Sequence, residues 1–160
     1  MKKTAYLSLG SNVGDRRANL RNAIGKLLNL GNLVAVSSFY ETEPVEFTDQ
    51  PWFLNCAVAL QTELLAADFL PEIMAIEREL GRQRTQPKGP RTIDIDVLLF
   101  GKAVMQSSQL TLPHPAMHER RFVLEPLAEI APDLHHPVLK KSVRELLASL
   151  PKRGGMVKKT

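Results

Sequence analysis

The clearest hydrophobic pattern in the chain is the segment Thr92–Phe100, where polar and β-branched residues alternate before a closing apolar run. After the Gly-Pro turn that precedes it, this alternation predicts a β-strand. Residues two apart on a strand point to the same face, so Asp94 and Asp96 are expected to share one with Leu98. The residues predicted on the opposite face are Ile93, Ile95, Val97 and Leu99.

The same patterns divide the preceding part of the chain into strands and helices. Short apolar runs predict strands over Ala5–Leu9, Val34–Tyr40 and Phe53–Leu60. Apolar residues at helical spacing predict a helix that Asp15 caps and Gly31 ends, and a second helix from about Ala66 to Leu80. The third strand has an apolar face, made by Leu54, Cys56, Val58 and Leu60.

The order strand-helix-strand-strand-helix-strand predicts an α+β fold with a ferredoxin-like βαββαβ core. Its sheet is expected to be mostly antiparallel, with both helices on one face and the other face left open for a site. Beyond this core the pattern predicts a short extra strand region over Ala103–Leu112 and helical segments over Arg121–Ile130 and Ser142–Leu150. We expect one domain over residues 1–160, with 152–160 as a flexible basic tail.

Composition narrows the class of protein. Hydrophobic residues make up 44% and charged residues 24% of the chain, which is ordinary for a soluble globular protein. The single Cys56 excludes an internal disulfide framework and is typical of the reducing cytoplasm, where we place the protein. No apolar run approaches the ~20 residues of a membrane span, and no signal-peptide pattern opens the chain.

The net charge of +4 belongs to the end of the chain. The basic residues after position 151, where there is no acid, are Lys152, Arg153, Lys158 and Lys159. The other basic residues equal the 17 acidic residues in number, so positions 1–151 carry no net charge. This balance argues against a general nucleic-acid-binding surface. As a separate expectation, we take the protein to be a monomer.

Two carboxylates on one face of an apolar strand repel each other unless a cation lies between them. The α-carbons of Asp94 and Asp96 should lie roughly 6–7 Å apart, which lets both side chains bind the same hard cation or cation pair. Directly before them comes a locally basic segment that contains Arg78, Arg82, Arg84, Lys88 and Arg91. Together these features predict Mg²⁺ and a bound polyphosphate; the alternative is a solvated carboxylate pair neutralised by neighbouring arginines.

Several other candidate site residues have both a functional and a structural interpretation. Phe53 and Asn55, on the second face of their strand, either stack on and recognise a flat heterocycle or are an exposed aromatic and an edge amide. His114, fixed between two prolines, is either a hydrogen-bond donor to a phosphate or ribose or an ordinary loop histidine. The turn Gly10–Gly14 matches neither common phosphate-loop pattern. The histidines interpreted as structural, because they lack zinc-site spacing, are His118, His135 and His136.

Five stretches of the chain together form a family pattern. They are Tyr6–Asn12, Ser38–Val45, Gln50–Asn55, Gly89–Asp96 and Pro113–Leu124. The last two are the most specific, and the fourth has the sequence Gly-Pro-Arg-Thr-Ile-Asp-Ile-Asp. With these stretches the chain resembles the 6-hydroxymethyl-7,8-dihydropterin pyrophosphokinase family of folate biosynthesis, from residue 6 to about residue 135.

The resemblance implies a reaction in which the pterin hydroxymethyl oxygen attacks the β-phosphorus of ATP, a diphosphate group is transferred and AMP leaves. It implies two Mg²⁺ ions bound with ATP by Asp94 and Asp96, and Arg82 and Arg91 as catalytic arginines. The implied pterin-binding positions are Thr42, Pro44, Val45, Phe53, Asn55 and Phe122. The implied ATP-binding positions are Glu77, Arg84, Val97, Thr111, His114 and Arg120.

Two other classes of protein stay open at this point. A metal-dependent phosphohydrolase or nuclease would also use two acids and nearby arginines, but it leaves Phe53, Asn55 and Phe122 unexplained. A non-catalytic ferredoxin-like binding module, for example one that binds RNA through its sheet, would present aromatic residues on a basic sheet rather than two aspartates. ATP-dependent diphosphate transfer explains more of the residues than either.

Overall fold

The computed structural model describes residues 1–44, 49–81, 92–151 and 157–160. Its strands are β1 (Lys3–Ser11), β2 (Asn32–Val36), β3 (Tyr40–Thr42), β4 (Phe53–Thr62), β5 (Asp94–Phe100), β6 (Met105–Gln106), β7 (Thr111–Leu112) and β8 (Val157–Lys159). Its helices are α1 (Arg16–Leu27), α2 (Ala66–Glu79), α3 (Arg121–Ile130) and α4 (Val143–Ala148), with a 3₁₀ turn at Met117–Glu119. Within the described ranges, no helix combines the length and the apolar character needed to cross a membrane.

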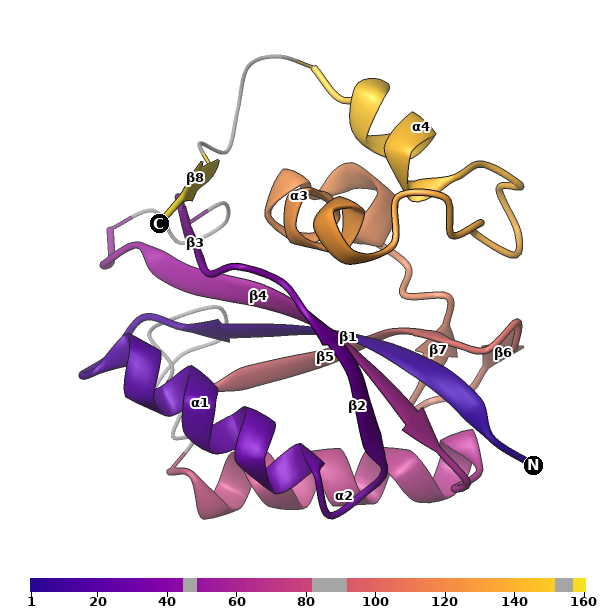
Figure 1. Ribbon diagram of the computed structural model, residues 1–160, viewed down its shortest axis with the longest axis horizontal. Coiled ribbons are helices and arrows are strands. Elements are labelled where there is room, and N and C mark those ends of the chain that lie inside the picture. Colours follow the sequence, from indigo (N-terminus) through magenta and orange to yellow (C-terminus); the bar gives the residue numbers. More distant parts are fainter. Residues whose placement is uncertain (45–48, 82–91, 152–156) are drawn as a thin grey trace.

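An antiparallel sheet lies at the centre of the described fold (Figure 1). Its strand order is β5-β1-β4-β3-β8, and β2 pairs with β4 on the same side as β3. The chain passes from β1 through α1 to β2 and from β4 through α2 to β5, which is the ferredoxin-like βαββαβ arrangement. The predicted α+β fold is therefore confirmed. The extra strand region is the two-stranded sheet of β6 and β7.

The helices α1 and α2 cover one face of the sheet, below it in Figure 1. The alternating apolar residues of β4 point to this face, as the sequence predicted, and all are buried: Leu54, Cys56, Val58 and Leu60. They pack against apolar residues of both helices, including Leu20, Leu27, Phe69 and Ile73. Burial raises the pKa of the Cys56 thiol to about 12, so the thiol stays protonated at neutral pH and is a core side chain rather than a nucleophile.

The second face of the sheet is not open along its whole length, contrary to expectation. Helices α3 and α4 lie over it, above the sheet in Figure 1. Apolar positions at helical spacing on α3 form a second core with the sheet and with α4. The buried residues of this second core are Ala57, Leu98, Leu99, Met117, Val123, Leu124, Leu127, Val143 and Leu146. A polar part of this face lies around the start of β5 and the end of β1, beyond the second core.

A β-bulge explains the one residue of β5 that the alternation placed on the wrong face. Tyr6 pairs with Leu99 and the next residue, Leu7, pairs with Val97, so Leu98 is an extra residue in β5. A bulge shifts the alternation by one position. Leu99 consequently joins Leu98 in the second core instead of lying with Val97 in the helix-side core.

Capping side chains explain where two of the helices, α1 and α4, begin. Asp15 accepts a hydrogen bond from Ala18 N–H (3.1 Å) and caps α1, as predicted, although the helix ends at Leu27, before the predicted stop at Gly31. Ser142 and Glu145 form a reciprocal capping box at the start of α4, which confirms the predicted capped helix. Both helices thus begin where a side chain satisfies a backbone N–H group that the helix leaves unpaired.

Candidate active site

Two aspartates mark the polar part of the second sheet face. Asp94 and Asp96 lie on β5 opposite Gly10 and Ser8 of β1. Ile95, between them, is buried in the helix-side core, so both carboxylates point to the other face, as the alternation predicted. Both aspartates are partly exposed, whereas the apolar residues that continue the strand are buried.

Gly10 provides space beside these aspartates. It pairs with Asp94 on one side and with Asn55 of β4 on the other. A Cβ atom at position 10 would lie 2.4 Å from Asn55 Oδ1 and 3.4 Å from Phe53 Cδ2. The side chains of Asn55 and Phe53 therefore lean over the bare backbone of Gly10, toward the strand that carries the aspartates. Sequence reasoning missed this role, although a glycine inside an apolar strand is itself a signal of close approach.

The amide of Asn55 is held in one orientation. Its Nδ2 group donates a hydrogen bond to Thr42 Oγ1, and both residues are buried, at 4% and 1% exposure. Because the amide nitrogen is committed to Thr42, the oxygen is the amide atom that lies over Gly10. Pro44, also buried, follows two residues after Thr42. The arrangement places a fixed hydrogen-bond acceptor beside an aromatic ring.

Glu77 reaches from α2 to the outer edge of β5. Its Oε2 atom accepts a hydrogen bond from Ile95 N–H at 2.8 Å, and the residue is buried. Since β5 is the end strand of the sheet within the described ranges, no described strand pairs with this amide on that side. Glu77 thereby stabilises the strand between its two aspartates. Its contact with ATP stays a prediction.

His114 lies next to β5, where its backbone N–H donates to Leu98 O (2.9 Å). Its ring Nδ1 accepts a hydrogen bond from Ala116 N–H (3.1 Å). In the neutral ring this leaves the proton on Nε2, which makes that atom a donor. This is the tautomer that a contact with a phosphate or ribose oxygen requires.

The other predicted substrate residues within the described ranges come from β5, β7 and the start of α3. Arg120 and Phe122 stand at the start of α3, with the guanidinium carbon 5.6 Å from the ring centroid, and Phe122 packs partly against the second core. Thr111 is a half-buried residue of β7. Val97 is buried in the helix-side core, so only its main chain is available to a ligand. The predicted site residues outside the described ranges are Val45, Arg82, Arg84 and Arg91.

The carboxylates of Asp94 and Asp96 are a donor set that fits Mg²⁺. Within the described ranges, no group of three or more His, Cys, Asp or Glu side chains is arranged to hold a metal. Mg²⁺ commonly uses only one or two carboxylates and takes its other ligands from water and substrate phosphates. Two accessible carboxylates beside Gly10 and Ser8 therefore fit a metal that arrives with a polyphosphate.

Comparison with known proteins gives a consistent result. The model of the 7,8-dihydro-6-hydroxymethylpterin-pyrophosphokinase family matches residues 6–132. A 2-amino-4-hydroxy-6-hydroxymethyldihydropteridine pyrophosphokinase of Methylorubrum extorquens is 49% identical over 152 residues, which cover 94% of this chain and 95% of the relative. The Bacillus subtilis protein of that name is 48% identical over 132 residues, covering 81% of this chain and 79% of the relative.

Some similar proteins are much longer than this chain. The folic acid synthesis protein fol1 of Schizosaccharomyces pombe is 42% identical over 95% of this chain, but the match spans only 21% of that relative. A solved structure of HPPK-DHPS from Plasmodium falciparum superimposes with a TM-score of 0.74 at 16% identity, covering 92% of this chain and 45% of that one. At that identity the superposition supports the fold alone.

Proposed function

The chain belongs to the 7,8-dihydro-6-hydroxymethylpterin-pyrophosphokinase family, and on that basis we propose that it transfers diphosphate from ATP to 6-hydroxymethyl-7,8-dihydropterin in folate biosynthesis. The hydroxymethyl oxygen forms a bond to the β-phosphorus of ATP and loses its proton. The bond between that phosphorus and the oxygen leading to the α-phosphorus breaks, and AMP leaves. We assign no residue as the base that accepts the proton.

The observation that carries this proposal is the arrangement around Gly10. Its bare backbone separates two carboxylates on β5 from an amide and an aromatic ring on β4. A metal-bound polyphosphate suits the first pair, and a flat heterocycle with polar edges suits the second. A phosphohydrolase would not need the second pair.

The pterin half follows from the orientation of Asn55. Because its Nδ2 atom donates to Thr42, its Oδ1 atom accepts a hydrogen bond from an N–H or amino group on the pterin edge. Phe53 stacks on the ring from the β4 side, and Phe122, at the start of α3, is the opposing aromatic residue. Pro44 and Val45 complete the proposed pterin-binding set.

The ATP half depends on the aspartates and on nearby basic residues. Asp94 and Asp96 would hold Mg²⁺, two ions with ATP, and the bound metal would reduce the negative charge on the oxygens of the attacked phosphoryl group, which makes its phosphorus a better electrophile. Arg82 and Arg91 would stabilise charge on the transferred phosphates, since a guanidinium binds phosphate oxygens in a bidentate way. The remaining residues proposed to contact ATP are Glu77, Arg84, Val97, Thr111, His114 and Arg120.

Product analysis tests the proposal. We expect the protein to convert ATP to AMP in the presence of Mg²⁺ only when the pterin is also present; formation of ADP, or of AMP without pterin, would contradict it.

Asp94→Asn and Asp96→Asn should each lower turnover by on the order of a hundredfold without a change in circular dichroism. Asp133→Asn is the control, because the Asp133 side chain is 83% exposed and its ion pair with Arg144 (3.3 Å) lies on the surface.

A further inference from the structure

Two arginines occupy the first turn of α1, where the helix dipole disfavours positive charge. Arg16 and Arg17 follow the capping residue Asp15, and the first turn contains no acidic residue. Both side chains leave the helix and reach the region of β3. Arg17 lies 5.6 Å from the ring of Phe39 and donates to Thr160 Oγ1 at 2.8 Å. The position of these charges therefore depends on partners outside the helix.

Arg16 has the stronger set of contacts. Its Nη1 atom donates to Glu41 Oε2 at 2.8 Å and its Nη2 atom to Glu41 Oε1 at 2.6 Å, which is a bidentate ion pair. Nη1 also donates to the backbone oxygen of Trp52 at 3.1 Å. The hydrogen bonds to Arg16 lower the pKa of Glu41, and the same bonds raise the pKa of Arg16. One guanidinium thus binds both β3 and the residue that precedes β4.

Each residue that Arg16 contacts is next in the sequence to a proposed pterin residue. Glu41 precedes Thr42 on β3, and Trp52 precedes Phe53 on β4. Thr42 and Phe53 are the last residue pair of the β3–β4 ladder, and their neighbours Glu43 and Trp52 lie outside both strands. Since β3 has only three residues, its ladder alone constrains that end weakly. Arg16 reaches from α1 and connects the two chain segments at this end of the ladder, through Glu41 and the Trp52 carbonyl.

We propose that Arg16 is a positioning residue for pterin recognition. It touches no substrate atom; it acts through Glu41 and the Trp52 carbonyl, which keep Thr42 against Asn55 and keep Phe53 beside Gly10. This inference rests on the proposed function of those residues. It requires that loss of Arg16 weaken pterin binding while leaving the phosphate-binding half of the site unchanged.

The variant Arg16→Gln tests this role. We expect its dissociation constant for the pterin to rise about tenfold, with kcat and the KM for ATP nearly unchanged, because only binding in the pterin half is affected. In the protein without ligands, the side-chain amide resonances of Asn55 should shift in ¹⁵N NMR spectra, since its bond to Thr42 is loosened. Glu41→Gln should give the same changes, and the double variant no further ones.

Controls separate the possible outcomes. Lys26→Gln removes another ion pair of α1, the one with Glu79 (2.8 Å), and should change neither pterin binding nor the Asn55 resonances. Arg16→Lys keeps the charge without the bidentate fork and serves if Arg16→Gln does not fold; it should weaken binding as well. If the unmodified protein binds no pterin, the proposed function is wrong, and the Asn55 resonances still test the positioning. Unchanged resonances and pterin affinity in Arg16→Gln would overturn the inference.

Discussion

At the scale of single residues, the absence of a side chain at position 10 is as important for the site as the side chains around it. The surrounding side chains leave no room for a methyl group there, since Asn55 Oδ1 lies 2.4 Å from the position of a Cβ atom. Asn55 cannot retreat easily, because its amide is buried and donates to Thr42. A substitution at Gly10 must therefore displace the acceptor proposed to bind the pterin.

We expect Gly10→Ala to destabilise the protein by about 1–3 kcal/mol, the usual cost of forcing a methyl group into packed structure. Pterin affinity should fall as well, because Asn55 and Phe53 move. Gly25→Ala is a matched control: apart from the neighbouring backbone of its own helix, no described atom lies within 4 Å of its Cβ position. Because Gly25 is inside α1, the substitution should stabilise the protein by about 0.5–1 kcal/mol. Urea unfolding and pterin titration measure both effects, and equal behaviour of the two variants would refute the steric argument.

Some of these residues could be predicted from the sequence and others could not. The alternation around Asp94 and Asp96 fixed their common face because Ile95 needs burial. The same rule failed for Leu99, because a bulge at Leu98 depends on pairing with β1, which is far away in the sequence. The contact of Gly10 with Asn55 is also a cross-strand property, and no local pattern contains it.

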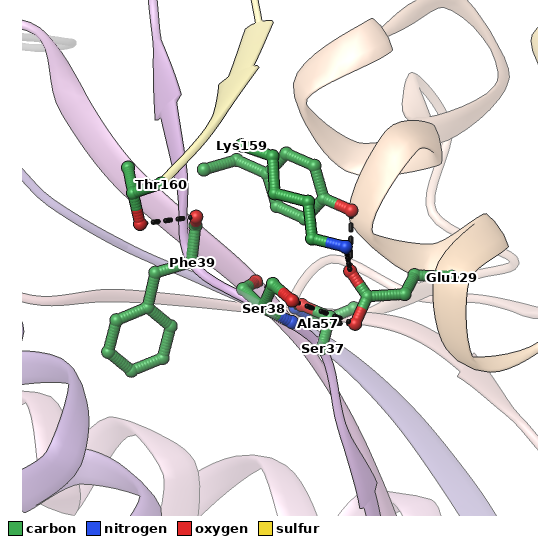
Figure 2. A network of polar contacts seen from close by, with 8 residues as sticks. Ser37, Ser38, Phe39, Ala57, Glu129, Lys159 and Thr160 are labelled. Carbon is green, nitrogen blue, oxygen red and sulfur yellow. Dashed lines mark hydrogen bonds and ion pairs between the residues drawn. The ribbon is translucent and has the colours of Figure 1, made fainter.

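At the scale of elements, β3 is held from both sides of the sheet. On the helix side Glu41 binds Arg16, and on the other side the carboxylate of Glu129 in α3 accepts hydrogen bonds from Tyr40 OH (2.5 Å) and Ser38 N–H (2.8 Å). Figure 2 shows Glu129 facing Ser38, with the Nζ atom of Lys159 in β8 3.9 Å from its Oε1 atom. A strand of three residues is thereby fixed to α1, α3 and β8.

The Glu129 contacts should make stability depend on pH. Burial opposes ionisation of this carboxyl, but the hydrogen bonds from Tyr40 and Ser38 outweigh it and lower the pKa of Glu129 below 4.5. A lowered pKa in the folded state adds stability above the unfolded-state pKa, and this stability is lost as the pH falls through the folded-state value. We therefore expect the free energy of unfolding to fall less between about pH 5 and pH 3 in Glu129→Gln than in the unmodified protein.

Tyr40→Phe provides the matched test of this assignment. It keeps the aromatic ring and removes one donor to Glu129, so its loss of stability on acidification should be intermediate. Urea unfolding at several pH values measures all three proteins. If Glu129→Gln loses as much stability on acidification as the unmodified protein, the pH dependence belongs to other carboxylates.

The boundaries of β3 could not be predicted from the sequence. One strand was expected over Val34–Tyr40, but the structure has a break between β2 and β3. At this break the Ser37 N–H still donates to Ala57 O, but the Ala57 N–H donates to the Ser37 hydroxyl instead of a backbone carbonyl, so a side chain replaces one bond of the ladder. Residues 157–159, expected as part of a frayed tail, form β8 on the edge of β3. Pairing with a distant strand decides both features.

At the scale of the whole molecule, the sheet separates two cores that differ in their relation to the site. The helix-side core of α1 and α2 was predictable, because periods of two and 3.6 residues agree along β4 and both helices. The second core was not, since the continuous apolar run Leu98–Phe100 does not reveal which face each residue takes. The proposed site lies where this second core ends, and its aromatic residue Phe122 is carried by α3.

This arrangement predicts that equally destabilising substitutions in the two cores have unequal effects on pterin binding. Leu127 in α3 and Leu27 in α1 are both completely buried, one in each core, so replacing either with Ala should lower the free energy of unfolding by about 2–5 kcal/mol. Only Leu127→Ala should also weaken pterin binding, because it loosens the helix that carries Phe122, whereas Leu27 lies at the far end of α1 from Arg16. Urea unfolding and pterin titration at a temperature where both variants are folded compare them directly. Equal loss of pterin affinity in both would mean that affinity follows overall stability, and that α3 has no separate part in forming the site.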